Sequence, residues 1–196
     1  MIDIPSGDAI YSLPSLPISL ENAGTWGNYG GYAFDFIDNI KGRREFSSDQ
    51  FKADASRGNL PSVSWVYAPH EFSEHPRGYR DTDPRVGNVT LGMQWTVDQV
   101  NAIVDGGLWS KSAIFITWDD WGGWYDHVAP PSVQTWVDGT QFRYGYRVAC
   151  LVLSPYARKG ISNILHSHII LTNIISSIQI HVLLLLRRLC SCTRLG

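Results

Sequence analysis

The sequence has no surplus of positive charge and few cysteines. Its 196 residues hold 16 Lys and Arg against 18 Asp and Glu, a formal net charge of −2. A nucleic-acid-binding surface needs clustered basic residues to neutralise phosphates, so we expect no nucleic-acid partner. Of the three cysteines, Cys190 and Cys192 lack the two-residue spacing of a zinc knuckle. Cys150 falls in an apolar run, where we expect a small buried side chain.

Two further absences concern the ends of the chain. Residues 1–17 contain neither a basic start nor an apolar core, so they do not fit a secretory signal peptide, and the sequence indicates no localisation. Residues 161–196 contain no Asp, no Glu and no aromatic residue, although aromatics are dense before Gly160. We therefore expect residues 1–160 to belong to one domain and residues 161–196 to be a divergent or frameshifted tail.

Three interpretations of this tail stay open: a shifted reading frame, a divergent amphipathic helix and a membrane span. A shifted frame explains the abrupt change of composition. Residues 164–186 are long enough to cross a bilayer, but they include histidines, amides and serines. Polar groups are costly in lipid, so we expect no stable membrane span.

Local patterns before Gly160 predict alternating strands, loops and helices. A helix is expected over residues 47–56, and a second one carries the set of apolar residues Met93, Val97, Val100 and Val104 and ends at residues 106–107. The apolar runs at 62–67, 113–118 and 148–153 have strand length, and we expect the last two to be covered on both faces. This alternation favours an α/β fold, a layered sheet flanked by helices.

The loop after Trp118 holds the densest group of polar candidates. It contains Asp119-Asp120, then Gly122-Gly123 and Asp126-His127. Adjacent aspartates can face one point only where a strand ends, and ligands bind at such ends in open α/β sheets. Carboxylates this dense suit a divalent metal ion: calcium, magnesium, manganese or zinc. The alternative is that the aspartates cap the glycine turn, but three tryptophans in so short a stretch favour the walls of a pocket.

The stretch TWDDWGGWYDHVAPP at 117–131 resembles the T-W/Y-D-D/E-x-G-G-x-Y/F-D-H-V-x-P-P signature of a bacterial phosphoesterase family. That family contains phospholipase C and acid phosphatase type enzymes and is related to the alkaline phosphatase superfamily. Further blocks resemble it in the same order: LPSVSWV at 60–66, SEHP at 73–76, the segment 101–110, and RVACLVLSPYARKG at 147–160. The resemblance covers roughly residues 18–160.

The resemblance implies an alkaline phosphatase-like fold and metal-dependent hydrolysis of a phosphate ester substrate, a phospholipid or a small phosphomonoester. It implies that Asp119 and Asp120 bind the metal and that His75 contacts the phosphate or the leaving group. Asp126 and His127 would support the loop or complete the site.

Part of the family pattern has no counterpart here. The family opens with an E-N-x-S-F-D block that binds metal, followed by a Ser or Thr nucleophile; Glu21-Asn22 lacks that context. We therefore expect a fold incomplete at the N-terminus and a weakly active or inactive phosphoesterase. The alternative is a non-catalytic metal- or ligand-binding fragment, or a decayed gene product. The oligomeric state is not indicated.

Overall fold

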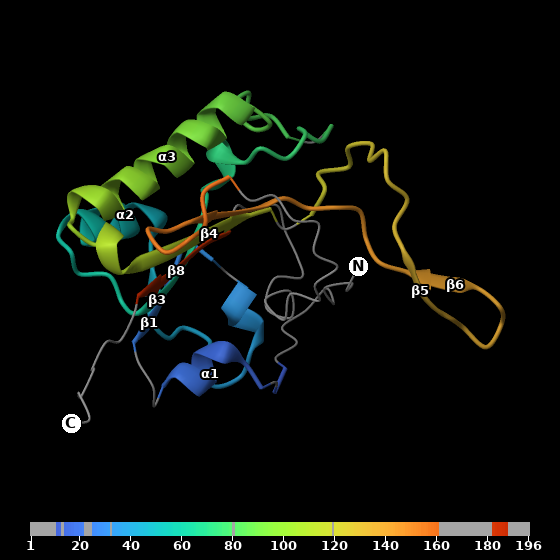
Figure 1. The fold of residues 1–196 in the computed structure, drawn as a ribbon, viewed down its shortest axis with the longest axis horizontal. Helices are drawn as coiled ribbons and strands as arrows, with labels where there is room; N and C mark the ends of the chain where they lie inside the picture. Colours follow the sequence, from blue (N-terminus) through green and yellow to red (C-terminus); the bar gives the residue numbers. More distant parts are fainter. Residues whose placement is uncertain are drawn as a thin grey trace.

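The computed structural model of this protein describes residues 11–12, 14–21, 25–31, 33–79, 81–118, 120–160 and 182–187. These residues form a mixed α/β fold with helices on both faces of a sheet (Figure 1). The helices are α1 (Leu16–Leu20), α2 (Ser48–Ser56) and α3 (Val89–Asp105), with 3-10 turns at Ala33–Phe36, His70–Phe72 and Trp109–Lys111. The main strands are β1 (Trp26–Tyr29), β2 (Glu45–Phe46), β3 (Val63–Tyr67), β4 (Ser112–Thr117), β7 (Cys150–Leu153) and β8 (Val182–Arg187). The predicted α/β class is confirmed.

Strand β8 joins the two halves of this sheet, whose order is β2-β1-β3-β8-β4-β7. β1 is parallel to β2 and β3, whereas β8 is antiparallel to both β3 and β4. Strands β3 and β4 therefore run in the same direction. Val182 pairs with both Tyr67 and Thr117, so the carboxyl ends of β3 and β4 lie level at one edge of the sheet.

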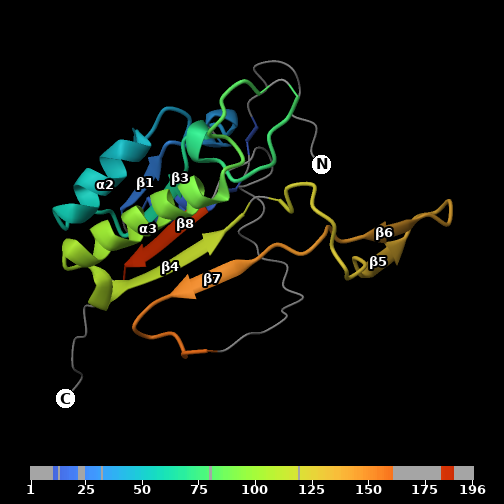
Figure 2. The ribbon, with the colours of Figure 1, turned by 90° about the horizontal axis from the view of Figure 1, so that it is seen from above.

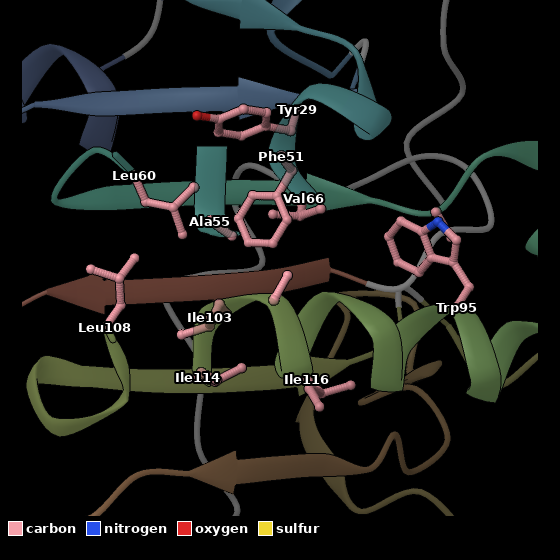
Figure 3. Close-up of a cluster of buried hydrophobic side chains, with 12 residues drawn as sticks. Tyr29, Phe51, Ala55, Leu60, Val66, Trp95, Ile103, Leu108, Ile114 and Ile116 are labelled. Atoms are coloured by element: carbon pink, nitrogen blue, oxygen red, sulfur yellow. The ribbon is translucent and has the colours of Figure 1, made fainter. Parts of the chain in front are cut away.

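Each face of the sheet is covered by its own apolar cluster. On one face, α2 and α3 pack on the strands through the cluster of Figure 3, which includes Phe51, Trp95, Ile103, Val66 and Ile114. The other face is covered by a second cluster, which includes Trp26, Phe34, Ile40 and Trp65 together with Ile18 of α1. Side chains of successive strand residues point to opposite faces, so one strand serves both clusters.

Local signals located α2, β3 and β4 within about two residues, and their prediction is confirmed. At α2, the Ser47 side chain accepts a hydrogen bond from the Gln50 amide at 3.2 Å, an N-cap that stabilises a helix by about 1 kcal/mol. Gly58 follows the helix with φ of +72°, a conformation that favours glycine. Caps and breakers are short-range features, which is why the sequence predicts them well.

Helix α3 is present, and Val100 of its predicted apolar face packs partly buried against the core. The other three residues of that face do not. Met93, Val97 and Val104 are exposed, whereas the core is built from Trp95, Ala102 and Ile103. The C-cap residue of α3, Gly106, lies so close to α2 that a Cβ there would be 1.8 Å from the Ala55 carbonyl oxygen. A side chain at position 106 would therefore clash with the backbone of α2.

Strand β7 contradicts two predictions. It lies at the edge of the described sheet, paired with β4 alone, and most of its residues are exposed. Coverage on both faces, predicted for residues 148–153, is therefore wrong for this strand. Cys150 is exposed rather than buried.

Only six residues of the tail are described, and they form β8 in the middle of the sheet. The helical and membrane-span interpretations are therefore wrong for residues 182–187. Within the described ranges, no helix is long and apolar enough to cross a membrane. The domain boundary at Gly160 stays a prediction.

A further pair of strands, β5 (Ser132–Thr135) and β6 (Gln141–Arg143), forms a separate antiparallel hairpin. The hairpin projects from the body of the molecule in both views (Figures 1 and 2). All of its strand residues are exposed.

The position of β8 makes a testable prediction. Leu184 pairs with Trp65 on one side and Phe115 on the other. In Leu184→Pro, proline removes a ladder donor and orphans a carbonyl in the sheet, which costs about 1–3 kcal/mol. The Tm measured by calorimetry should fall by roughly 2–12 °C. The control is Val133→Pro in the separate hairpin, which should leave the main transition in place; equal Tm values for the two variants would contradict the central role of β8.

Candidate functional site

Two loops meet at the edge where β3 and β4 end. The histidine loop, residues 68–88, follows β3 and carries His75; the aspartate loop, residues 118–131, follows β4. Because β3 and β4 are parallel and level, their following loops leave the sheet on the same side. Asp119 lies outside the described residues. The other predicted site residues, Asp120, Asp126 and His127, are described.

Direct contacts hold the two loops together. The Trp118 Nε1–H donates a hydrogen bond to Glu74 Oε2 at 2.9 Å. Pro76 lies against the glycine turn, since a Cβ added to Gly122 would be 3.3 Å from Pro76 Cδ. The structure thus brings the segment that carries His75 beside the segment that carries Asp120.

Asp120 caps the glycine turn. Its Oδ1 accepts a hydrogen bond from the Gly122 amide at 2.5 Å. Gly122 and Gly123 have φ of +68° and +75°, values that glycine adopts without strain. This is the capping role considered as the alternative to metal binding. The two roles are compatible, because a carboxylate has about four lone-pair sites.

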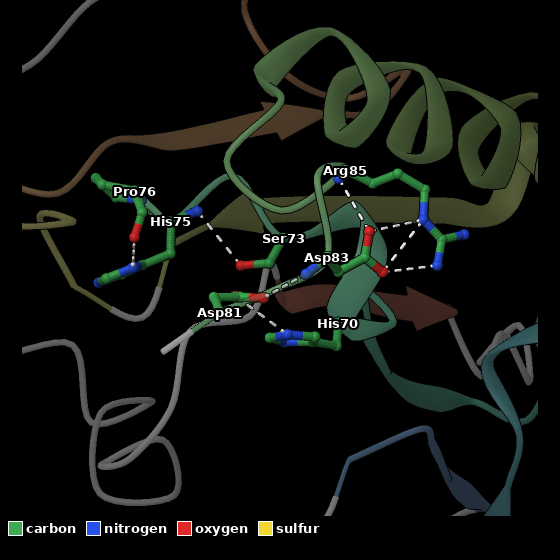
Figure 4. Close-up of polar contacts among 7 residues, drawn as sticks. All are labelled: His70, Ser73, His75, Pro76, Asp81, Asp83 and Arg85. Carbon is green, nitrogen blue, oxygen red and sulfur yellow. Dashed lines mark hydrogen bonds and ion pairs between the residues drawn. The ribbon is translucent and has the colours of Figure 1, made fainter. Parts of the chain in front are cut away.

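The ring of His75 is oriented by its own loop (Figure 4). Its Nδ1 lies 2.7 Å from the Pro76 carbonyl oxygen, which can only accept, so Nδ1 carries a proton. The His75 amide donates to Ser73 Oγ at 3.3 Å. In the neutral ring the lone pair therefore lies on Nε2, the nitrogen suited to accept a proton or contact a ligand.

The rest of the histidine loop is braced by polar side-chain contacts. His70 Nε2 lies 3.3 Å from Asp81 Oδ2, and Arg85 Nη2 lies 2.7 Å from Asp83 Oδ2, as Figure 4 shows. Hydrogen bonds from the Arg85 side chain and amide lower the pKa of Asp83 to about 2. His70 thus contacts Asp81 rather than His75, and we give it no role at the site.

Asp126 clamps the far end of the aspartate loop to the segment between the hairpin and β7. The Arg147 guanidinium donates to both of its carboxylate oxygens, with Nη2 at 2.6 Å from Oδ1. The backbone amides of Arg147 and Val128 donate to the same carboxylate. These hydrogen bonds hold the pKa of Asp126 far below its usual range, with those from the Arg147 side chain contributing most. Only 10% of the Asp126 side chain is exposed.

Two aromatic residues of the aspartate loop point into solvent. Trp124 and Tyr125 are 66% and 83% exposed, so the prediction that the loop aromatics wall the site is wrong for these two. The ring of His127 contacts Tyr125 edge-on, with the centroids 5.0 Å apart, and His127 is itself exposed. Trp118 differs, because it is half-buried and bonded to Glu74.

The described residues supply part of a metal site at most. No group of three His, Cys, Asp or Glu side chains among them is placed to hold a metal ion. Asp120 offers the hard oxygen that a divalent cation prefers. Glu21 is committed elsewhere: Trp26 Nε1 donates to it at 3.0 Å, and Arg43 lies 3.1 Å away. Asn22 lies outside the described residues.

Sequence reasoning missed the contacts of three residues that organise this region: Glu74, Trp118 and Arg147. Glu74 directly precedes His75, and that adjacency is the one local signal that could have singled it out. Arg147 pairs with a residue 21 positions away, and Trp118 with one 44 positions away. Local patterns contain no trace of such long-range partners.

Comparison with known proteins identifies similar sequences. The sequence profile of the phosphoesterase family matches residues 19–179. The chain is 29% identical to a non-hemolytic phospholipase C of Pseudomonas aeruginosa, over 76% of the chain and 27% of that protein. It is 32% identical to a non-hemolytic phospholipase C of Burkholderia pseudomallei, over 57% of the chain and 18% of that protein. It is 31% identical to the non-specific phospholipase C6 of Arabidopsis thaliana, over 57% of the chain and 23% of that protein.

The chain thus spans about a quarter or less of the length of these relatives. No solved structure matches it.

The clamp between Asp126 and Arg147 can be tested by Asp126→Asn. The lowered pKa means that ionised Asp126 stabilises the folded loop fully above the ordinary Asp pKa of about 3.9. That stabilisation is lost as the pH falls toward the lowered value. At neutral pH the variant should show faster hydrogen exchange at the Val128 and Arg147 amides.

The matched control is Asp138→Asn at the hairpin tip, where the Thr140 amide lowers the pKa of Asp138. It should affect the tip alone. Unchanged exchange at Val128 in Asp126→Asn would show that the clamp does not order the loop.

Proposed function

The chain belongs to the phosphoesterase family, and we propose that its site serves metal-dependent hydrolysis of phosphate esters. The observation that carries this proposal is the contact between the histidine and aspartate loops at the level ends of β3 and β4. Ligands bind at the carboxyl ends of strands in sheets of this kind. The proposal includes an alkaline phosphatase-like arrangement of the whole domain, with further site residues contributed from outside the described part.

Asp119 and Asp120 would hold the divalent metal ion. Such an ion supplies positive charge that offsets charge on the phosphoryl group and lowers the pKa of a bound hydroxyl. The backbone around Asp120 is fixed before any ion arrives, because the glycine turn is closed by its own carboxylate. A ligand held in place in this way loses little conformational entropy on binding.

His75 would act on the phosphate or the leaving group. With Nδ1–H bonded to the Pro76 carbonyl oxygen, the ring exchanges protons through Nε2. The protonated ring can donate from Nε2 to a phosphoryl or leaving-group oxygen, and the neutral ring can accept a proton there. The carbonyl partner fixes the ring orientation in both states. We assign no nucleophile.

The substrate class we propose is the phosphodiester of a phospholipid headgroup. The relatives named above carry the name phospholipase C, which supports a phospholipid over a small phosphomonoester. Hydrolysis of p-nitrophenyl phosphorylcholine and of p-nitrophenyl phosphate by the purified chain distinguishes the two. Faster turnover of the monoester would overturn the phospholipid assignment.

One observation favours a second candidate, a non-catalytic module that binds a metal or ligand. Within the described ranges, no three ligand side chains converge. Binding of Mn²⁺ without turnover of either ester would support this module. Metal-dependent turnover would exclude it.

Asp120→Asn separates metal binding from capping. Asparagine keeps an oxygen that can accept from the Gly122 amide, so the turn and the Tm should be preserved. The charge is lost, so Mn²⁺ affinity measured by calorimetry should fall at least about 10- to 100-fold, with a comparable loss of turnover. Asp138→Asn, outside both loops, should change neither. Unchanged Mn²⁺ affinity in Asp120→Asn would leave Asp120 with the capping role alone.

His75→Gln should lower kcat about 10²- to 10⁴-fold, because glutamine cannot transfer a proton. His70→Gln is the matched control: it alters the same loop at a histidine paired with Asp81, and kcat should stay within about twofold of the unaltered chain. Steady-state kinetics on p-nitrophenyl phosphorylcholine measure both. Equal losses in the two variants would point to loop disruption and against a chemical role for His75.

A further inference from the structure

We propose that Glu74 is a positioning residue that sets the distance between the histidine loop and the aspartate loop through its hydrogen bond with Trp118. The consequence for catalysis rests on the function proposed above; the mechanical role does not. Nothing in the sequence pattern assigned Glu74 a role.

The bond joins the two loops beside their candidate site residues. Glu74 directly precedes His75, and Trp118 directly precedes Asp119. The indole has a single donor, and that donor meets a carboxylate oxygen at 2.9 Å. A hydrogen bond to an ionised acceptor is about twice as strong as a neutral one. Any movement of one loop is therefore transmitted to the other within one residue of the site.

Glu74 is also held from its other side by α3. A Cβ added to Gly92 would lie 2.4 Å from Glu74 Cγ and 2.8 Å from Oε1. Gly92 belongs to the first turn of α3, since the helix begins at Val89, and the positive end of the helix dipole favours a carboxylate there. Glu74 is thus confined between a helix that packs on the sheet and the indole of Trp118.

This arrangement fixes the aspartate loop at both ends. Trp118 is tied to Glu74 at the start of the loop, and Asp126 is tied to Arg147 near its end. Asp119 and Asp120 lie between these two points. Misplacing a catalytic group by about 1 Å can cost about 10²-fold in rate, so a bond that sets loop position affects chemistry without touching substrate.

Hydrogen exchange measures the mechanical role without metal or substrate. Glu74→Ala and Trp118→Phe each remove one partner, and each should speed exchange of the amides in residues 118–124 by about tenfold. The double variant should match the single ones, since both remove the same bond. Glu74→Gln keeps an acceptor oxygen and should restore most of the protection.

A variant in α3 gives an independent test. Gly92→Ala places a methyl group against Glu74 and also against the Phe72 carbonyl oxygen, 2.7 Å away. It should therefore speed exchange in both the histidine loop and the aspartate loop while α3 itself stays protected. Two outcomes would overturn the proposal. One is unchanged exchange of the aspartate loop in Glu74→Ala; the other is an equal increase of exchange in the loop, α2 and α3, which would indicate general destabilisation. Additive effects in the double variant would overturn it as well.

The effect of the Glu74 variants on the site is measured by Mn²⁺ titration and by steady-state kinetics on p-nitrophenyl phosphorylcholine. Glu74→Ala should lower kcat more than it raises KM, and Glu74→Gln should rescue kcat. If Glu74→Gln behaves like Glu74→Ala, the acceptor role is wrong. If the exchange results hold but the unaltered chain neither binds Mn²⁺ nor hydrolyses the ester, the proposed function fails while the positioning role of Glu74 stands.

Discussion

The structure depends on the pairing of β8 with two strands at once. In the described sheet, β2, β1 and β3 form one block and β4 and β7 another, and both blocks contact β8 along its length. Because β8 fills the space between them, β3 and β4 run parallel with their ends level. The histidine and aspartate loops share one edge for that reason. Strand β8, which follows β4 in the sequence by more than 60 residues, thus determines where the candidate site lies.

The site is assembled from two loops that need different kinds of support. The histidine loop is ordered by contacts within itself, through the Pro76 carbonyl oxygen, the contact of His70 with Asp81 and the ion pair of Arg85 with Asp83. The aspartate loop relies on partners outside itself, Glu74 and Arg147. Its own internal bond, from the Gly122 amide to Asp120, shapes only the turn. The geometry between His75 and the aspartates is therefore a property of tertiary contacts rather than of either loop.

Features of the fold and the site could be predicted from the sequence where the interacting residues lie close together in the chain. Helix α2 and strand β4 were predictable, because caps, breakers and apolar runs act within a few residues. The family-like stretch at 117–131 located the aspartate loop, and His75 was found in the same way. Strand β8 was not predictable, because an apolar run without acids has no local feature that distinguishes a central strand from a tail. The role of Glu74 was not predictable either, because its partner Trp118 lies 44 residues away in the sequence.

The clamp of Asp126 on Arg147 has a consequence for the hairpin between them. It brings together two points 21 residues apart, so the intervening chain leaves and re-enters the body of the protein at nearly one place. Exposed loops whose ends are held together tolerate changes of length and sequence. The turn between β5 and β6 is therefore a natural insertion point, where a reporter domain or an affinity tag would be carried without altering the path of either site loop.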